Sequence, residues 1–148
     1  KNFEKRKSAT HVVATDGSGL QRLTPWKLNA SHPDWSPDGQ RIAFDSGDAQ
    51  LPGNKGDIYV MGADGSARTR LTDSPRIREG KPFKQDGNHV WSPSGTMIMY
   101  VRFHARRFVD PESLPPGGKL IVMNADGSGK HVVVSGKLQN RVDWGTHP

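Results

Sequence analysis

Histidine and aspartate are the side chains of this chain best suited to bind a metal or move a proton. The six histidines are scattered along the sequence. His32 and His89 nevertheless take similar places in two related stretches, just before or at an expected strand. Both could therefore approach one shared channel and hold a metal ion or an anion there. The simpler alternative is that each imidazole bonds a neighbouring backbone carbonyl.

Three aspartates recur in an Asp-Gly-Ser sequence, namely Asp16, Asp64 and Asp126. Carboxylates in loops can bind calcium, but Ca²⁺ takes about six to eight oxygen ligands. One carboxylate per turn falls short of that number. We therefore expect each aspartate to hydrogen-bond its own turn. Calcium is the weaker alternative, and no other cofactor is expected.

Catalytic motifs are missing from the sequence. It contains no Gly-x-Ser-x-Gly elbow, no His-Glu-x-x-His pair, no glycine-rich phosphate loop and no cysteine. The chain is therefore expected not to be an enzyme. Its formal charge of +6 permits acidic partners. Nucleic acid is disfavoured because the aromatic residues are not interleaved with the basic ones. No apolar run reaches about 18 residues, so no membrane span is expected.

The elements that must position these side chains are repeated. The Asp-Gly-Ser phrase follows an apolar run each time, and a Trp-containing phrase lies between its copies. Self-similarity on this scale indicates one structural unit copied in tandem. The first phrase occupies residues 14–19, 62–66 and 124–129, and the second occupies 34–39, 90–95 and, truncated, 142–145.

Each unit is expected to be a meander of four antiparallel strands. Asp-Gly between apolar runs is a strong hairpin signal, and Pro-Asp-Gly or Pro-Ser-Gly forms a tight turn. No stretch has a helical period over ten or more residues, so helix content should be near zero. The expected strands are 33–36, 41–45, 57–61 and 69–72 in one unit, 89–92, 97–103, 120–124 and 131–134 in the next, 11–15 and 22–24 before them, and 141–144 after them.

Together, Trp35–Gly39, Ile42–Phe44, Ile58–Met61, Asp64-Gly65 and Arg70–Thr72 resemble the repeat of TolB-type β-propellers, relatives of the WD-type repeat. The resemblance covers about residues 11 to 145. It implies an all-β fold of four-stranded propeller blades, about three per chain, and a periplasmic or extracellular location. Within a single segment 1–148, it divides the chain into a half blade 8–25, blades 33–72 and 89–135, and an opening strand 140–145.

The second blade departs from the family pattern in two places. Ser94 stands where Asp is usual, and His131–Val134 lacks the Arg-Leu-Thr ending. Residues shared by the copies are expected to be structural, with Trp35, Trp91 and Trp144 packed between neighbouring blades. The expected core residues are Leu23, Ile42, Phe44, Leu71, Met97, Met99, Tyr100 and Ile121.

The long connections differ between copies and should emerge on one face. They span 25–32, 47–56, 73–88 and 104–118, and long loops of this kind are often functional. Arginine with exposed aromatics is typical of interaction hot spots. Ordinary solvated loops are the alternative. The predicted binding residues of this face are Trp26, His32, Arg76, Arg78, Lys81, His89, His104, Arg106 and Arg107.

The predicted function is a non-enzymatic scaffold that binds a protein or another polymer through this long-loop face. Two blades with open ends form an incomplete propeller, so the chain is either a piece of a longer protein or is completed by other copies. In the second case it would be a self-assembling subunit, as a closed dimer ring or a filament. A carbohydrate-active enzyme and the propeller domain of a peptidase are further alternatives.

Overall fold

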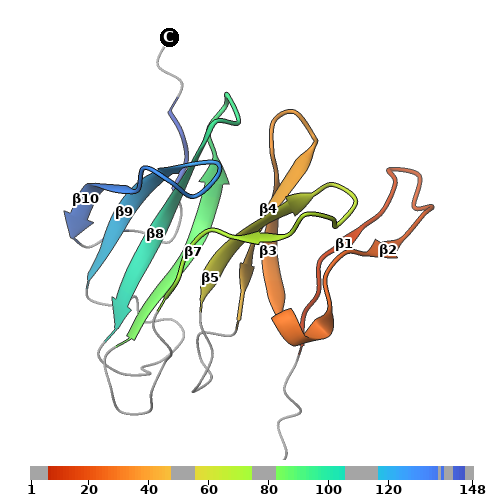
Figure 1. The fold of residues 1–148 in the computed structure, drawn as a ribbon, viewed down its shortest axis with the longest axis horizontal. Coiled ribbons are helices and arrows are strands. Elements are labelled where there is room, and N and C mark those ends of the chain that lie inside the picture. Colours follow the sequence, from red (N-terminus) through yellow and green to blue (C-terminus); the bar gives the residue numbers. More distant parts are fainter. Residues whose placement is uncertain are drawn as a thin grey trace, which may run out of the picture.

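The computed structural model describes residues 7–47, 56–74, 83–105, 117–136, 138 and 142–145. Within them the fold is all-β, as expected, and helix is confined to one short 3-10 turn, η1 (Trp26–Leu28). Three antiparallel sheets stand side by side (Figure 1). Their strands are β1 (His11–Val12) and β2 (Gln21–Arg22); β3 (Ala30–Trp35), β4 (Arg41–Ser46), β5 (Asp57–Gly62) and β6 (Thr69–Arg70); and β7 (Phe83–Trp91), β8 (Met97–Ala105), β9 (Gly117–Asn124) and β10 (His131–Gly136).

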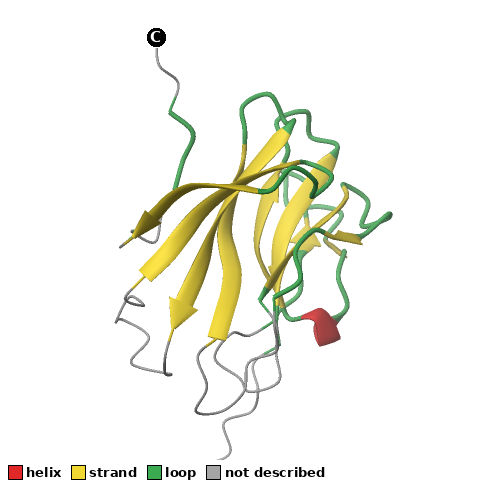
Figure 2. Cartoon of the chain, turned by 60° about the vertical axis from the view of Figure 1, so that its left-hand side comes forward, coloured by secondary structure: helices red, strands yellow, loops and turns green. Residues whose placement is uncertain are grey.

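Both four-stranded sheets are simple meanders, in the order β3-β4-β5-β6 and β7-β8-β9-β10. Tight turns join the first strand to the second and the third to the fourth, and they lie at one end of the sheets (Figure 2). The other end of each sheet carries the end of β4 or β8 and the start of β5 or β9. We call this second end the long-loop end.

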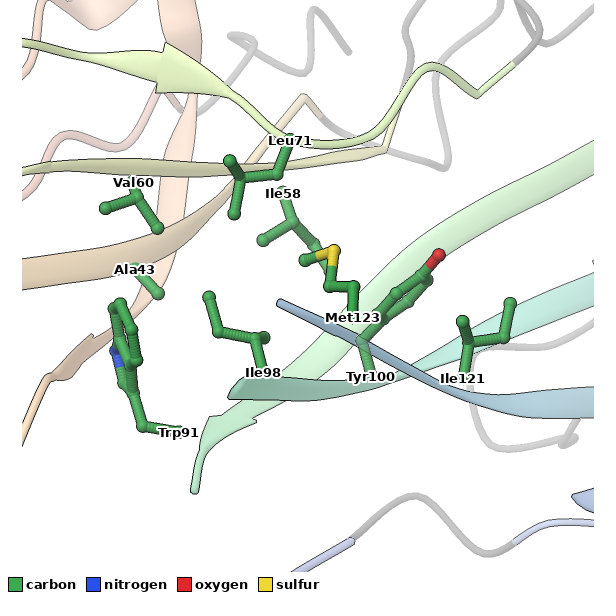
Figure 3. Close-up of a cluster of buried hydrophobic side chains, with 9 residues drawn as sticks. All are labelled: Ala43, Ile58, Val60, Leu71, Trp91, Ile98, Tyr100, Ile121 and Met123. Carbon is green, nitrogen blue, oxygen red and sulfur yellow. The ribbon is translucent and has the colours of Figure 1, made fainter. Parts of the chain in front are cut away.

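The core lies between the sheets rather than inside one. Ala43, Ile58 and Leu71 of the central sheet pack against Trp91 and other apolar side chains of the β7–β10 sheet (Figure 3). Because side chains alternate along a strand, the neighbours of Ala43 point the other way, toward β1 and β2. A second cluster on that side contains Leu23, Ala30, Ile42, Phe44 and Met61.

The repeated sequences contact each other where two neighbouring sheets meet. We call each such junction between sheets a seam. A Cβ on Gly65 would lie 3.2 Å from the carbonyl oxygen of Leu23, and a Cβ on Gly127 would lie 3.3 Å from Leu71. Both glycines have φ near +85°, where an L side chain is strained, so only glycine fits the turn and the close approach together. The Asp-Gly-Ser turns at Gly65 and Gly127 therefore rest on the leucine of the preceding sheet's Arg-Leu-Thr ending.

The tryptophans form a second seam contact. The indole Nε1–H of Trp91 donates to the carbonyl of Asp34 at 3.2 Å, and that of Trp144 donates to the carbonyl of Val90 at 3.3 Å. The Arg41 guanidinium also lies 4.7 Å from the centre of the Trp91 ring. In both cases the acceptor is the residue just before the tryptophan of the neighbouring sheet.

Several expectations differ from the structure. Trp35 was expected in a seam but is 46% exposed, because β3 is an edge strand and the described residues place no inner strand against it. Met97 was expected in the core but is 38% exposed, since it opens β8 beside a surface turn. The other seven expected core residues are buried, which confirms them.

The strand boundaries also differ. Residues 142–145 form no strand in the structure, because no described strand pairs with them. In contrast, β3, β7 and β8 extend beyond the expected bounds into stretches that were expected to be loops. As a result His32 lies within a strand rather than on a connection, and His89 lies inside β7 rather than at the start of a strand.

Candidate functional site

The polar residues that differ between the two blades gather toward the long-loop end. The ladder β3–β4 pairs Asp34 with Ala43, and the ladder β7–β8 pairs Val90 with Met99, so the blades align with Trp35 on Trp91. In that alignment Val101 of the second blade is the residue equivalent to Asp45. By the same alignment, His89 replaces Pro33, Asp86 replaces Ala30 and Arg102 replaces Ser46.

One carboxylate joins two imidazoles at the centre of this region. Asp45 in β4 accepts a hydrogen bond from Nδ1 of His32 at 3.1 Å and from Nδ1 of His89 at 2.8 Å. His32 comes from the same sheet, whereas His89 comes from β7 of the next sheet. Asp45 therefore connects two blades through side chains that the blades do not share.

Backbone irregularities help to aim these side chains. The β3–β4 register shifts between Ser31 and Asp34, and the β7–β8 register shifts between Gly87 and Val90. His32 in the first bulge has φ of 49°. A bulge turns the strand locally and re-aims its side chains, and such strained positions cluster at functional sites.

The three groups differ strongly in exposure. The His32 side chain is 71% exposed, the Asp45 side chain 9% and the His89 side chain only 1%. Because both Nδ1 atoms bond the carboxylate, we assign the Nδ1–H form to both rings. The Nε2 atom of His32 then remains for a ligand, while Nε2 of His89 is buried with no hydrogen-bond partner among the described residues.

Asp45 and His32 shift each other's pKa. Burial alone would raise the pKa of Asp45, but the hydrogen bonds from His32 and His89 outweigh it and hold that pKa below its ordinary value. The hydrogen bond to Asp45 raises the pKa of His32, against a smaller opposing effect of burial. Asp45 thus favours the protonated, cationic form of His32.

A buried ion pair lies beside this group on β7 and β8. Asp86 is fully buried and accepts two hydrogen bonds from Arg102, from Nε at 2.6 Å and from a terminal nitrogen at 2.7 Å. This pairing raises the pKa of Arg102. Burial, helped by the charge of Asp86, raises the pKa of Tyr100 to about 12. The Tyr100 hydroxyl is buried without a hydrogen-bond partner in the described part of the chain.

A third carboxylate anchors the start of β5 at the same end. Asp57 is buried, accepts the backbone N–H of Ser74 at 2.6 Å and pairs with the Arg70 guanidinium at 3.0 Å. The carbonyl of Gly56 accepts the N–H of Asp86 at 3.0 Å, which ties β5 to β7. These contacts hold the start of β5 and link the two blades at the long-loop end.

The structure places the predicted binding residues unevenly. His32 and His89 come together on Asp45. Trp26 lies in η1, 44% exposed, with the Arg22 guanidinium 5.5 Å from its ring centre. His104 pairs through its backbone with Gly117 on β9. The remaining predicted residues lie outside the described part of the chain, namely Arg76, Arg78, Lys81, Arg106 and Arg107.

The sequence interpretation missed Asp45, Asp86 and Arg102. A signal was present for Asp45 and Arg102, because each directly follows an apolar run within its strand, and a buried charge needs a partner. Its partner could not be read from the sequence, since the Asp45–His89 bond joins residues 44 positions apart.

The turn aspartates bond their own turns. Asp16, Asp64 and Asp126 each accept the backbone N–H of the serine two residues on, at 2.9, 2.9 and 2.8 Å. The bonds from those serines lower the pKa of all three carboxyls. Among the residues that the structure describes, no three His, Cys, Asp or Glu side chains are grouped so as to hold a metal ion.

Comparison with known proteins places this chain in a family. Residues 5–109 match the family described as the dipeptidyl peptidase IV N-terminal region. An uncharacterised peptidase of Bacillus subtilis (strain 168), YuxL, is 33% identical over 88 residues, which is 60% of this chain and 12% of that protein.

Two solved structures share the fold. A structure assigned to TolB from Agrobacterium tumefaciens superposes with a TM-score of 0.69 at 26% identity, over 92% of this chain and 46% of that one. An oligogalacturonate lyase in complex with manganese superposes with a TM-score of 0.55 at 15% identity, over 83% of this chain and 29% of that one. At that identity the lyase shows the fold alone.

This chain thus spans less than half the length of each of these proteins. No helix in its described part is long and apolar enough to cross a membrane. Its antiparallel four-stranded sheets, with repeated turns and seam contacts, are those of a β-propeller segment of the TolB type. The chain belongs to the family of the dipeptidyl peptidase IV N-terminal region.

Proposed function

We propose that this chain is a non-catalytic β-propeller scaffold that binds a carboxylate-rich polypeptide at its long-loop end. The observation that carries the proposal is the exposed His32, which the buried Asp45 holds in place at 3.1 Å. A structural histidine needs no such exposure, whereas a contact residue needs both exposure and a fixed orientation.

The charge of this end suits an acidic ligand. Asp45 raises the pKa of His32, so the ring carries an exposed Nε2–H⁺ at mildly acidic pH. Lys27 and the exposed Trp26 lie in η1, which leads directly into β3. The whole chain is also basic, with a formal charge of +6. A protonated imidazole and an ammonium both favour carboxylates over neutral groups.

The family supports a polypeptide as the ligand. Both the family match and the YuxL similarity point to proteins related to peptidases. Within the described residues, neither imidazole hydrogen-bonds a serine or threonine hydroxyl, and their bonds to Asp45 support a positioning role. The proposal therefore assigns recognition to this chain and no bond cleavage.

A binding assay tests the proposal directly. Fluorescence anisotropy at about pH 6 would compare a fluorescein-labelled glutamate-rich peptide with its glutamine counterpart, and we expect binding of the first only. His32→Ala should weaken binding at least fivefold, which is about 1 kcal/mol. His131→Ala is the matched control, because His131 is exposed on β10 and its ring bonds the Gly129 carbonyl. Equal loss in both variants, or none in either, would refute the site.

Two further arms examine the ligand class and the predicted loop residues. Polygalacturonate carries carboxylates on a sugar backbone, so preferential binding of it would favour a carbohydrate ligand and refute the polypeptide assignment. Replacing Arg76, Arg78, Arg106 and Arg107 by alanine should reduce peptide capture without changing the molar mass. Unchanged capture would remove those residues from the proposed surface.

A second candidate is that the segment serves a peptidase as its non-catalytic propeller. The specific observation in its favour is the 33% identity with YuxL over 88 residues. An immunoblot of source cells with an antibody to this chain would test it. A band far above 16.3 kDa would support this candidate, and a band at that mass would refute it. Export from the cytoplasm, which the TolB-type resemblance implies, stays a prediction that cell fractionation would test.

A further inference from the structure

Each flank of the described chain carries one half of the seam contacts that join the blades. On the flank of β1 and β3, a Cβ on Gly17 would meet nothing within 4 Å, although the same turn glycine rests on a leucine at Gly65 and Gly127. Trp35 on that flank is 46% exposed. In the described part of the chain, these two residues therefore lack the partners that their equivalents contact at the other seams.

The opposite flank carries the matching acceptors. The ladder β5–β6 pairs Val60 with Thr69, and the ladder β9–β10 pairs Val122 with His131. Two residues further on in the sequence, Val133 corresponds to Leu71, and it lies at a register shift of the β9–β10 ladder between Val132 and Val134. Leu71 is 7% exposed beneath the Gly127 turn, whereas Val133 is 53% exposed.

The same flank also holds an acceptor for an indole. Asp34 and Val90, each the residue before a blade tryptophan, accept the indole N–H of the next blade. Asp143 holds that place before Trp144, which docks on Val90. Every contact that one flank lacks is therefore present in complementary form on the other.

We propose that the two flanks bind each other between two copies of this chain. The Gly17 turn of one copy packs on Val133 of the second, and the Trp35 indole of the first donates to the Asp143 carbonyl of the second. Residues 142–145 of one copy then lie beside β1 and β2 of the other in a composite blade. Val133, which is 53% exposed, becomes covered by the neighbouring turn.

This contact is head-to-tail, because it joins two different surfaces. Such a contact produces a closed ring if the rotation between copies closes, and an open filament if it does not. With two complete blades and a composite blade per copy, two copies supply six blades. A propeller made this way covers the flanks that hold the exposed Trp35 and Val133.

Light scattering after size-exclusion chromatography tests the assembly. We expect the 148-residue chain at about 100 μM to elute at about twice 16.3 kDa or at a higher multiple. A folded species at 16.3 kDa would overturn the proposal and favour a further blade of a longer polypeptide as the covering element.

Two variants each disable one flank. Val133→Asp and Trp35→Ala change side chains that are 53% and 46% exposed, so each variant should keep its circular dichroism spectrum and urea midpoint as a monomer. Each should elute at the monomer mass when alone. Thr69→Asp, on exposed β6 of the central sheet, is the control and should assemble like the unchanged chain.

Mixing the two variants provides the decisive result. The Val133→Asp chain keeps an intact Trp35 flank, and the Trp35→Ala chain keeps an intact Val133 flank. An equimolar mixture should therefore form a heterodimer of about twice the monomer mass through one intact seam. If both variants are folded and the mixture stays monomeric, the head-to-tail pairing is wrong. Loss of assembly with retained peptide binding, or the reverse, separates this proposal from the proposed function.

Discussion

Substituting alanine for glycine at matched turns measures how firmly the seam holds the blades. Gly127→Ala and Gly17→Ala change the same position of the repeat, with φ of +86° and +84°. Both variants strain the backbone by about 1 to 2 kcal/mol, since an L side chain is disfavoured there. They differ in surroundings, because a Cβ at Gly127 meets the Cα, Cδ2 and carbonyl oxygen of Leu71 at 3.3 Å, and a Cβ at Gly17 meets open space.

The extra cost at Gly127 comes from displacing Leu71. Two of its three close atoms belong to the backbone, so a side-chain rotation cannot relieve the contact. Overpacking of this kind costs about 1 to 3 kcal/mol. We expect Gly127→Ala to lose about 2 to 5 kcal/mol of unfolding free energy and Gly17→Ala about 1 to 2 kcal/mol.

Urea unfolding followed by tryptophan fluorescence measures both losses. The protein should be dilute enough to be monomeric, so that the Gly17 turn stays uncovered. Linear extrapolation gives the free energy of unfolding if the slopes of the two variants agree. Losses that match within about 0.5 kcal/mol would show that the turn does not press on Leu71, and the seam geometry would be wrong.

Three further predictions concern the polar groups. Tyr100→Phe should leave stability unchanged or raise it by about 1 kcal/mol in urea unfolding, because it removes a buried hydroxyl with no partner in the described chain; a loss above 1 kcal/mol would show that the hydroxyl is bonded. Asp86→Asn should cost about 3 kcal/mol by the same measurement, since it leaves the Arg102 charge facing a neutral amide, and a cost below 1 kcal/mol would contradict a buried ion pair. His32 has a raised pKa, so its bond to Asp45 stabilises the fold below the ordinary histidine pKa and fades as the pH rises through the raised value. His32→Gln should accordingly lower the free energy of unfolding more at about pH 5.5 than at about pH 8.5. Equal losses at both pH values would refute an ion pair between His32 and Asp45.

The repeated parts of this fold could be predicted from the sequence because they depend on local chemistry. The Asp-Gly turns need φ above zero, and apolar runs on either side need a strand partner. Ile42, Phe44 and Tyr100 were therefore assigned correctly to the core. Trp35 was not, because the burial of a seam residue depends on the neighbouring sheet and not on its own strand.

The candidate site could be predicted only in part. His32 and His89 were chosen for their positions beside the first strands, and the structure brings both to Asp45. The carboxylate was missed although it directly follows the apolar stretch of β4, because the sequence does not show its partner. Its burial arises from the packing of β4 against β7, a long-range contact that local patterns do not specify.

The seam contacts also bear on how such a chain could grow. Glycine on leucine and indole on carbonyl recur at successive seams, so a duplicated blade would find suitable neighbours wherever it was inserted. The bond between Asp45 and His89 uses residues that the copies do not share. It therefore marks one junction as different from the rest and preserves the order of the blades after duplication.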